Sequence, residues 1–287
     1  MQLRPSERRQ AKIKMALQGS AGSGKTFSSL LIAKGLAQGD FSKVAIIDTE
    51  NGSADLYAHL GSYNVLSLTP PFTPQKYVEA IEVCEKATMQ VIIIDSISHC
   101  WDYLLDYHSS LAGNSFTNWA KIKPLEKMFV DKILQSKAHI IATMRTKQDY
   151  VLNQKDGKFI PEKVGLKAVQ RDGLDYEFTL VFDIDSKHFA VASKDRTGLF
   201  IGTTEFKIAE GTGKKILDWC HSGNSQEDLQ HIVYQSIQDC NSLAELSALY
   251  KQYPQFQQDL KPDFEARKSL LIQFTHPQNF TQNGQLH

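Results

Sequence analysis

The sequence predicts an α/β fold in which helices cover a mainly parallel sheet that ends in an antiparallel edge hairpin, with a small C-terminal helical appendage. Short apolar runs alternate with segments of helical length, a rhythm typical of a parallel sheet buried on both faces. The runs are Val44–Ile47, Val65–Leu68, Val91–Ile94 and His139–Thr143. Two further strand-like runs, Glu177–Ile184 and His188–Lys194, are joined by a short polar link, which favours a hairpin at the edge of the sheet.

The spacing of apolar residues, together with glycines and polar segments that interrupt it, predicts the remaining helices, strands and loops of the core. Residues 11–18 alternate in polarity and predict a strand, and a glycine-rich turn then leads into a helix that stops near Gly39. Pro74–Thr88 and Ile122–Ser136 have helical length. Residues 145–174 are polar and charged and predict a long loop or hairpin, which in a compact domain usually has a function.

The composition changes from about Ser222, where apolar residues take up helical spacing. Ser242–Glu245 matches a capping box that opens a second helix, and Pro262 and Asp263 are typical of the start of a third. We therefore divide the chain into four parts. They are a basic N-terminal arm (1–10), an α/β core (11–222), a helical appendage (223–275) and a flexible tail (276–287).

The bulk composition excludes several kinds of protein. The 287 residues are 41% hydrophobic and carry no net charge, so a buried core is expected and no general attraction to nucleic acid is implied. The four cysteines form no CxxC pair, and the histidines show no metal-binding spacing, which disfavours disulfides and a zinc site. No apolar run is long enough to span a membrane, and we expect a cytoplasmic protein.

The glycine-rich turn fits the phosphate-binding pattern GxxxxGK[ST], between a predicted strand and a predicted helix. Glycines let backbone N–H groups surround phosphate oxygens, the lysine reaches the β- and γ-phosphates, and the last hydroxyl binds Mg²⁺. The sequence therefore predicts an ATP–Mg²⁺ site. Its binding residues are Gly19, Ser20, Ala21, Gly22, Ser23, Gly24, Lys25, Thr26 and Phe27.

A carboxylate ends the apolar run before Ser96. Asp95 stands where a buried parallel strand ends, which is where ligands bind in such sheets. We predict that Asp95 holds Mg²⁺ together with Thr26. The alternative is that Asp95 caps the next helix.

Two further carboxylates follow the run Val44–Ile47. Asp48 and Glu50 are two residues apart, so both would point to one side of an extended chain. ATP hydrolysis requires a group that orients or deprotonates the attacking water, and we predict Glu50 in this role. The reverse assignment, and a turn role for Asn51 and Gly52, stay open.

The order of Gly19–Thr26, Ile46–Glu50 and Ile94–Ser96 resembles the RecA-type ATPase core. In that family a catalytic glutamate follows the second strand in a D-x-E setting, and a serine follows the Mg²⁺-linked aspartate. The chain looks most like phage-encoded P-loop ATPases described as RecA-like single-strand annealing proteins. The shared stretches are Met144–Tyr150, Val169–Gly173 and Ala192–Gly198, and the resemblance covers about residues 10–205.

This resemblance implies a RecA-like P-loop NTPase core that assembles as a filament or a ring. In such assemblies two basic residues reach into the neighbour's ATP site, and Lys194 and Arg196 match that place. A solvated strand face paired with Asp195 or Glu205 is the alternative. The family's γ-phosphate sensor follows the fourth core strand. RecA itself has a glutamine there, and Arg145 is the nearest candidate in this chain.

The segment 145–171 interleaves cations with aromatic rings, a pattern suited to single-stranded DNA. The candidate DNA-binding residues are Lys147, Tyr150, Lys155, Lys158, Lys163, Lys167 and Arg171. Acidic residues dilute this charge, so a solvated hairpin is the alternative. The resemblance favours DNA, because the corresponding loops line the DNA path in RecA-type filaments.

Together these observations predict a DNA recombination protein that binds and hydrolyses ATP, assembles on single-stranded DNA and promotes annealing or strand exchange. The resemblance places it in the cytoplasm of a phage-infected or prophage-bearing bacterium, with a single-strand-binding protein as a candidate partner. The alternative is an ATP-dependent switch or loader that acts on a protein partner without direct stimulation by DNA. A small-molecule phosphotransferase is disfavoured, because the sequence shows no arginine-rich lid.

Overall fold

The computed structural model describes residues 8–155, 158–223 and 226–275, with side chains over 8–147, 167–223 and 227–273. The chain divides into two compact units. One spans Lys12–Cys220, and the other comprises the N-terminal residues to Ala11 and the segment from His221 onward. The tail 276–287 and residues 1–7 of the basic arm lie outside the described residues.

The larger unit is built on one mixed sheet in which the strands are ordered β3-β2-β4-β5-β1-β7-β8, with β6 paired to β5. The pairings among β1, β2, β3, β4, β5 and β7 are parallel, whereas β8 runs antiparallel to β7. The strands are β1 (Lys14–Gly19), β2 (Val44–Asp48), β3 (Asn64–Ser67), β4 (Val91–Asp95), β5 (His139–Lys155), β6 (Lys158–Ala168), β7 (Leu180–Ile184) and β8 (Ala190–Asp195). This confirms the predicted α/β fold with a mainly parallel sheet and an antiparallel edge hairpin.

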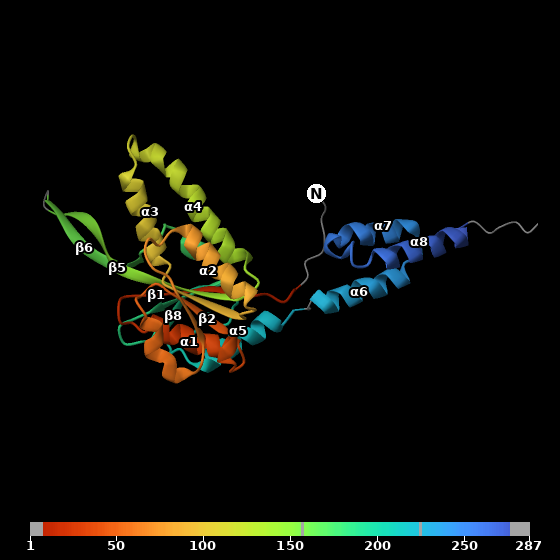
Figure 1. Ribbon diagram of the computed structural model, residues 1–287, viewed down its shortest axis with the longest axis horizontal. Helices are drawn as coiled ribbons and strands as arrows, with labels where there is room; N and C mark the ends of the chain where they lie inside the picture. Colours follow the sequence, from red (N-terminus) through yellow and green to blue (C-terminus); the bar gives the residue numbers. More distant parts are fainter. Residues whose placement is uncertain (1–7, 156–157, 224–225, 276–287) are drawn as a thin grey trace, which may run out of the picture. The chain divides into compact units, whose positions relative to one another are not determined.

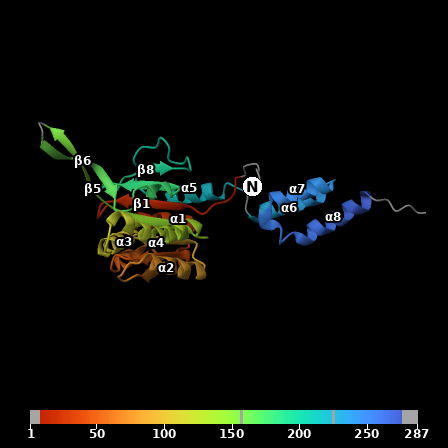
Figure 2. The same ribbon diagram turned by 90° about the horizontal axis from the view of Figure 1, so that it is seen from above.

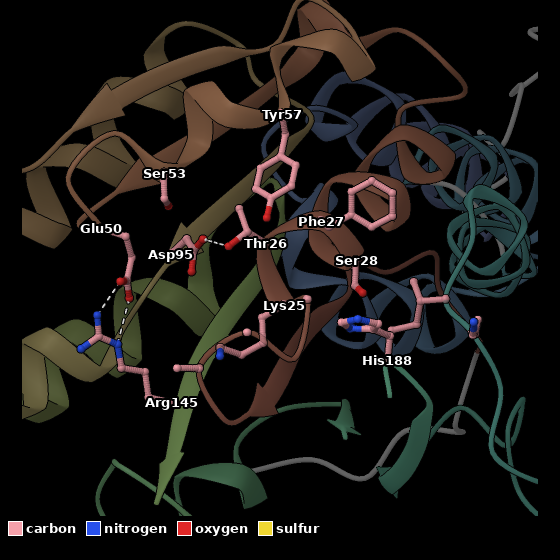
Figure 3. A pocket seen from close by; sticks show the side chains of 15 residues that line it. Lys25, Thr26, Phe27, Ser28, Glu50, Ser53, Tyr57, Asp95, Arg145 and His188 are labelled. Atoms are coloured by element: carbon pink, nitrogen blue, oxygen red, sulfur yellow. Dashed lines mark hydrogen bonds and ion pairs between the residues drawn. The ribbon is translucent and has the colours of Figure 1, made fainter. Parts of the chain in front are cut away.

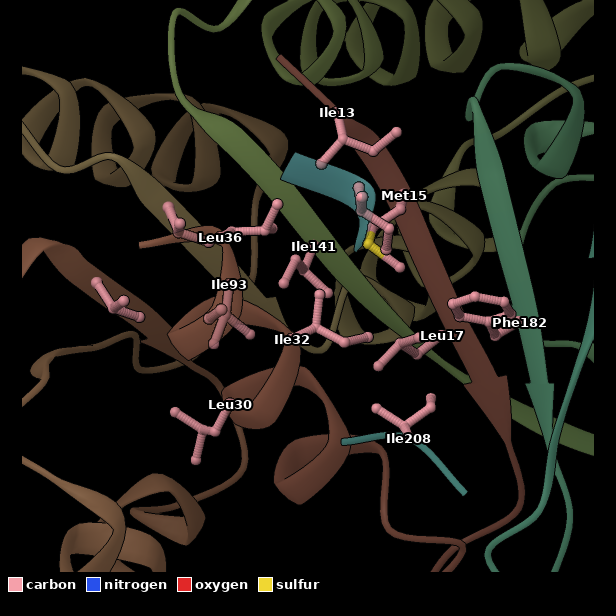
Figure 4. Packing of buried hydrophobic residues seen from close by; sticks show 14 of the residues in the cluster. Ile13, Met15, Leu17, Leu30, Ile32, Leu36, Ile93, Ile141, Phe182 and Ile208 are labelled. Atoms are coloured by element: carbon pink, nitrogen blue, oxygen red, sulfur yellow. The ribbon is translucent and has the colours of Figure 1, made fainter. Parts of the chain in front are cut away.

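Helices cover both faces of the sheet, which explains why its central strands are apolar on both sides (Figure 1). The helices of this unit are α1 (Lys25–Leu36), α2 (Pro74–Lys86), α3 (Ser98–Ser110), α4 (Ser115–Gln135) and α5 (Glu210–His221). Alternate residues of β1 enter different cores: Met15 and Leu17 join the side chains of α1 and α5, and Ala16 joins those of α2 and α4. Figure 4 shows the first of these cores, where Leu30 and Ile32 of α1 meet the sheet.

The polar segment that follows Thr143 forms a long antiparallel hairpin. β5 does not end at Thr143 but continues to Lys155, and Thr146–Lys155 pairs with Lys158–Ala168 of β6. Figures 1 and 2 show this hairpin projecting from the edge where the parallel strands end. The sequence after Thr143 lacks the long apolar run by which sequence reasoning recognises a buried strand, so the predicted strand was too short.

The smaller unit contains α6 (Gln226–Asp239), α7 (Leu243–Gln252) and α8 (Lys261–Thr275) around a core of its own. Ser242 caps α7 by accepting a hydrogen bond from the backbone N–H of Glu245 at 3.2 Å, as the capping-box pattern predicts. Among the described helices none combines the length and apolar character needed to cross a membrane.

Candidate functional site

The glycine-rich turn joins β1 to α1 and forms a wall of a cavity of 840 Å³ (Figure 3). Gly22 and Gly24 adopt left-handed conformations with φ of +76° and +90°, which side-chain-bearing residues adopt only with strain. Gly24 caps α1 without a side-chain hydrogen bond, so the first N–H groups of the helix remain for a ligand. At Gly19 a Cβ would lie 2.5 Å from both the carbonyl oxygen of Ile184 and Oγ of Ser23.

Lys25 folds back over this turn. Its Nζ donates hydrogen bonds to the carbonyl oxygens of Gly19 (3.0 Å) and Ser20 (2.9 Å). Burial lowers the pKa of Lys25 below its ordinary value, although the carboxylates of Asp95 and Glu50 favour the charged amine. A phosphate group in the turn would supply the negative charge that the buried ammonium needs.

Asp95 is buried at the end of β4 between two threonine hydroxyls. Thr26 Oγ1 donates to one carboxylate oxygen and Thr143 Oγ1 to the other, both at 2.5 Å. Burial raises the pKa of Asp95, and the two hydrogen bonds act in the opposite direction. The helix after Asp95 is capped by Ile97, without a side-chain hydrogen bond, so the geometry does not support the alternative of a helix cap.

Glu50 points into the same cavity from the segment after β2 (Figure 3). Its carboxylate accepts hydrogen bonds from Ser96 Oγ at 3.2 Å and from Nε of Arg145 at 3.0 Å, and it also forms an ion pair with the guanidinium. Burial would raise the pKa of Glu50, but the hydrogen bond and the charge of Arg145 lower it overall. The carboxylate is therefore ionised and held in one orientation.

Asp48 has a structural role in the same segment. It is 1% exposed, and its carboxylate accepts hydrogen bonds from the backbone N–H groups of Glu50 (2.6 Å) and Ala54 (3.3 Å). Asn51 and Gly52 adopt left-handed conformations and form the turn between them. Since Asp48 does not line the cavity and Glu50 does, the geometry favours Glu50 over Asp48 as the group that acts on water.

The site fits a nucleoside triphosphate with Mg²⁺. Ser23 Oγ is buried without a hydrogen-bond partner in the described part of the chain, and it faces the turn whose N–H groups are available to phosphates. The described residues contain no group of three or more His, Cys, Asp or Glu that could hold a metal ion. Mg²⁺ in nucleotide sites needs only one or two protein oxygens besides phosphates, and Thr26 and Asp95 offer them.

Several lining residues escaped the sequence analysis because they lie far from the glycine-rich turn in the chain. Tyr57, whose ring centroid lies 5.9 Å from that of the predicted residue Phe27, adds a second aromatic surface. His188 comes from the turn between β7 and β8, and its Nδ1 lies 3.0 Å from the carbonyl oxygen of Ser23. Lys207 also lines the cavity. Only the long-range pairing of the strands brings these residues together.

Lys194 and Arg196 lie away from the cavity of their own chain. Nζ of Lys194 donates to the carbonyl oxygens of Asp175, at 2.9 Å, and Tyr176, and Arg196 donates to the latter at 3.0 Å. Both side chains thus point toward the carbonyl oxygen of Tyr176, although Arg196 lies one residue beyond the end of β8 at Asp195. Neither lines the cavity, and their action on a neighbouring copy stays a prediction.

The candidate DNA-binding residues are only partly within the described side chains. Those of Tyr150, Lys155, Lys158 and Lys163 lie outside them. Of the others, Arg171 lies 2.6 Å from Glu126 and 3.7 Å from Glu177, and Lys167 lies 2.8 Å from Asp172. Lys147 is exposed. Arg171 and Lys167 therefore have acidic neighbours that offset their charge.

Comparison with known protein families identifies the larger unit. The family described as AAA domain matches residues 11–220, more than two thirds of the chain. The chain belongs to this AAA domain family. Its fold is that of a P-loop AAA-type NTPase, and P-loop domains of this type generally bind ATP with Mg²⁺. A comparison with curated proteins finds no matching sequence.

Proposed function

We propose that this AAA-family protein binds and hydrolyses ATP and couples hydrolysis to work on single-stranded DNA, as an oligomer that promotes annealing or strand exchange. One observation carries the ATPase part: Lys25, the Thr26–Asp95 pair and the Glu50 carboxylate converge on a single cavity from three different segments. The DNA part is supported by the sequence resemblance and by the hairpin that continues from β5, next to Arg145.

Each residue of the cavity has a distinct task in this proposal. The N–H groups of the turn and Lys25 bind the phosphates, and the base lies against Phe27 and Tyr57. Thr26 and Asp95 hold Mg²⁺, which when bound neutralises charge that develops on the phosphate oxygens.

Glu50 acts on the attacking water. It orients the water and accepts one of its protons as the new bond between the water oxygen and the γ-phosphorus forms. The bond from that phosphorus to the oxygen that leaves with ADP then breaks. Because Arg145 holds the Glu50 carboxylate ionised, Glu50 is ready to accept this proton.

The first test is the rate of ATP hydrolysis by wild type and by Glu50→Gln, with and without single-stranded DNA. The variant should bind a non-hydrolysable ATP analogue normally and hydrolyse ATP about 100- to 10,000-fold more slowly, since general-base catalysis contributes that much. Asp55→Asn, an exposed change on the neighbouring turn outside the cavity, is the matched control and should behave as wild type. Equal rates in Glu50→Gln and wild type would exclude Glu50 as the base.

The second test concerns the assembly. DNA should stimulate wild-type hydrolysis several-fold, and a Lys194→Ala/Arg196→Ala variant should bind ATP but lose the stimulation. Lys127→Ala, an exposed lysine on α4 paired with Asp131, is the control. If DNA has no effect and the double variant behaves as wild type, the DNA and trans-acting roles are wrong. The protein would then be a nucleotide switch that acts on a protein partner.

A further inference from the structure

A second cavity, of 530 Å³, lies at the base of the β5–β6 hairpin, where α3 and α4 meet it. We call it the tryptophan cleft. It is lined by Trp101, Asp102, Leu105, Trp119, Lys123, Glu126, Lys147 and the segment 167–172. None of these residues lines the nucleotide cavity, so the tryptophan cleft is a separate site that the ATPase chemistry does not use.

Aromatic rings form one side of the tryptophan cleft. The ring centroids of Trp101 on α3 and Trp119 on α4 lie 6.1 Å apart with planes inclined by 22°, and His108 stacks on Trp119 at 4.2 Å. Both tryptophans are only half-buried. The chain has three tryptophans in all, so two of the three line this one cleft. Large rings that stay partly in water are typical of recognition surfaces, because they give contact area at little entropic cost.

The charges of the tryptophan cleft leave two lysines available. Arg171 pairs with Glu126 at 2.6 Å and Lys167 with Asp172 at 2.8 Å, so these four side chains offset one another. The remaining charged side chains are Lys123, Lys147 and Asp102. Both lysines are exposed and form no ion pair with any other described side chain. A ligand here therefore meets two lysines outside any described ion pair, against one carboxylate, Asp102, which already feels the charge of Lys147.

One buried amide in the tryptophan cleft has neither a hydrogen bond nor an ion pair with any described residue. Nε2 of Gln170 is shielded from solvent and makes no hydrogen bond to any described residue. A buried amide without a partner costs about 1–3 kcal/mol, and this cost is removed when a ligand supplies an acceptor. Carbonyl oxygens and ring nitrogens on the edges of nucleobases are such acceptors.

We propose that the tryptophan cleft binds single-stranded DNA. An unpaired base stacks on the rings of Trp101 and Trp119 and accepts a hydrogen bond from Gln170, while the adjacent phosphates lie against Lys123 and Lys147. Flat rings, spaced cations and one amide donor together fit a base attached to a charged backbone better than a peptide. This inference rests on the proposed function, in which single-stranded DNA is the substrate, and gives that substrate a binding site.

Tryptophan fluorescence of the full-length chain tests the proposal directly. With excitation light that tyrosine does not absorb, only Trp101 and Trp119 emit in a Trp219→Phe background, and stacking of a base should quench them when an oligothymidylate is added. Fluorescence anisotropy of a labelled oligothymidylate then gives the affinity of each variant. Trp101→Leu and Trp119→Leu should each weaken binding about 5- to 140-fold, the equivalent of 1–3 kcal/mol for one stacked base, whereas Trp101→Phe should retain part of the affinity.

The two lysines have a different signature. Lys123→Ala and Lys147→Ala should each make log K less steeply dependent on log salt, by about 0.7 for each phosphate that the variant no longer neutralises. Lys121→Ala is the matched control, since it lies on α4 two residues from Lys123 and outside the cleft. A purely structural role for the lysines would change affinity without changing this slope.

Hydrolysis of ATP without DNA and binding of an ATP analogue, measured on the same preparations, separate the possible outcomes. If both tryptophan variants bind an ATP analogue and the oligonucleotide as wild type does, the tryptophan cleft is not the site, and the proposed function stands. If wild type hydrolyses ATP but binds no oligonucleotide, the proposal and the DNA part of the function both fail. If tryptophan-dependent binding occurs without hydrolysis, the proposal stands and the ATPase assignment fails.

Discussion

Two threonines on β5 give a matched test of how Asp95 is held. Thr143 is fully buried and donates a hydrogen bond of 2.5 Å to Asp95. The Oγ1 atom of Thr146 is also buried but has no partner in the described part of the chain. Threonine and valine have nearly the same shape, so Thr143→Val removes a hydrogen bond to a carboxylate and Thr146→Val removes only an unpaired hydroxyl.

The two changes should therefore differ in their effect on the free energy of unfolding. A hydrogen bond to a charged group contributes about 1.5–3 kcal/mol, so Thr143→Val should lower the free energy of unfolding by about 2 kcal/mol. Thr146→Val should leave it unchanged or raise it, since burying an unpaired hydroxyl is unfavourable. Urea denaturation followed by tryptophan fluorescence measures both values.

The same pair tests whether Asp95 holds Mg²⁺. Removal of a residue that fixes the orientation of a metal ligand typically lowers the affinity for the metal about 10- to 100-fold. Thr143→Val should therefore raise by that factor the Mg²⁺ concentration at which a non-hydrolysable ATP analogue binds, whereas Thr146→Val should not. Equal unfolding free energies and equal Mg²⁺ requirements in the two variants would refute the reasoning.

Three further predictions concern other parts of the larger unit. Burial lowers the pKa of Lys14 to about 8 from 10.5, so wild type should gain stability relative to Lys14→Met as pH rises from 8 to 10.5. The gain should reach at most about 3 kcal/mol, measured by denaturation at each pH. A Cβ at Gly35 would lie 2.3 Å from the backbone of α5, so Gly35→Ala should cost about 1–3 kcal/mol. Gly211→Ala, which has open space, should cost nothing. Arg145→Met should shift the acid limb of the pH profile of hydrolysis upward, because Glu50 loses the cation that lowers its pKa.

Much of the nucleotide site could be predicted because its residues are local in sequence or end a buried strand. The turn from Gly19 to Thr26 carries its chemistry in consecutive positions, and Asp95 follows an apolar run whose end must lie at the carboxyl edge of a parallel sheet. The choice between Asp48 and Glu50 could not be made in this way. Both follow the same strand, and only the turn, whose N–H groups bind Asp48, directs Glu50 into the cavity.

The parts that escaped prediction depend on long-range pairing. The resemblance already indicates Arg145 as a candidate γ-phosphate sensor, but not its partner. Arg145 lies 95 positions from Glu50 in the chain and binds its carboxylate, and nothing in either local sequence indicates this ion pair. The tryptophan cleft is a similar case. Trp101 and Trp119 lie on different helices, and each by itself resembles an ordinary core residue at helical spacing. Their stacking became visible only once α3 and α4 were placed side by side.

The two cavities are joined by short stretches of regular structure. β5 carries Arg145, which binds Glu50, and two residues later Lys147, which lines the tryptophan cleft. α3 carries His99, whose Nδ1 lies 2.7 Å from Oγ1 of Thr49, and two residues later Trp101. Closeness does not establish coupling between the two cavities. A shared strand or helix transmits a signal only when it has two conformations and ligands at both sites change the balance between them. A ligand in the tryptophan cleft that moved β5 or α3 would nevertheless also move Arg145, which binds Glu50, or His99, which contacts Thr49. The proposed stimulation of hydrolysis by DNA would then need no large rearrangement of the fold.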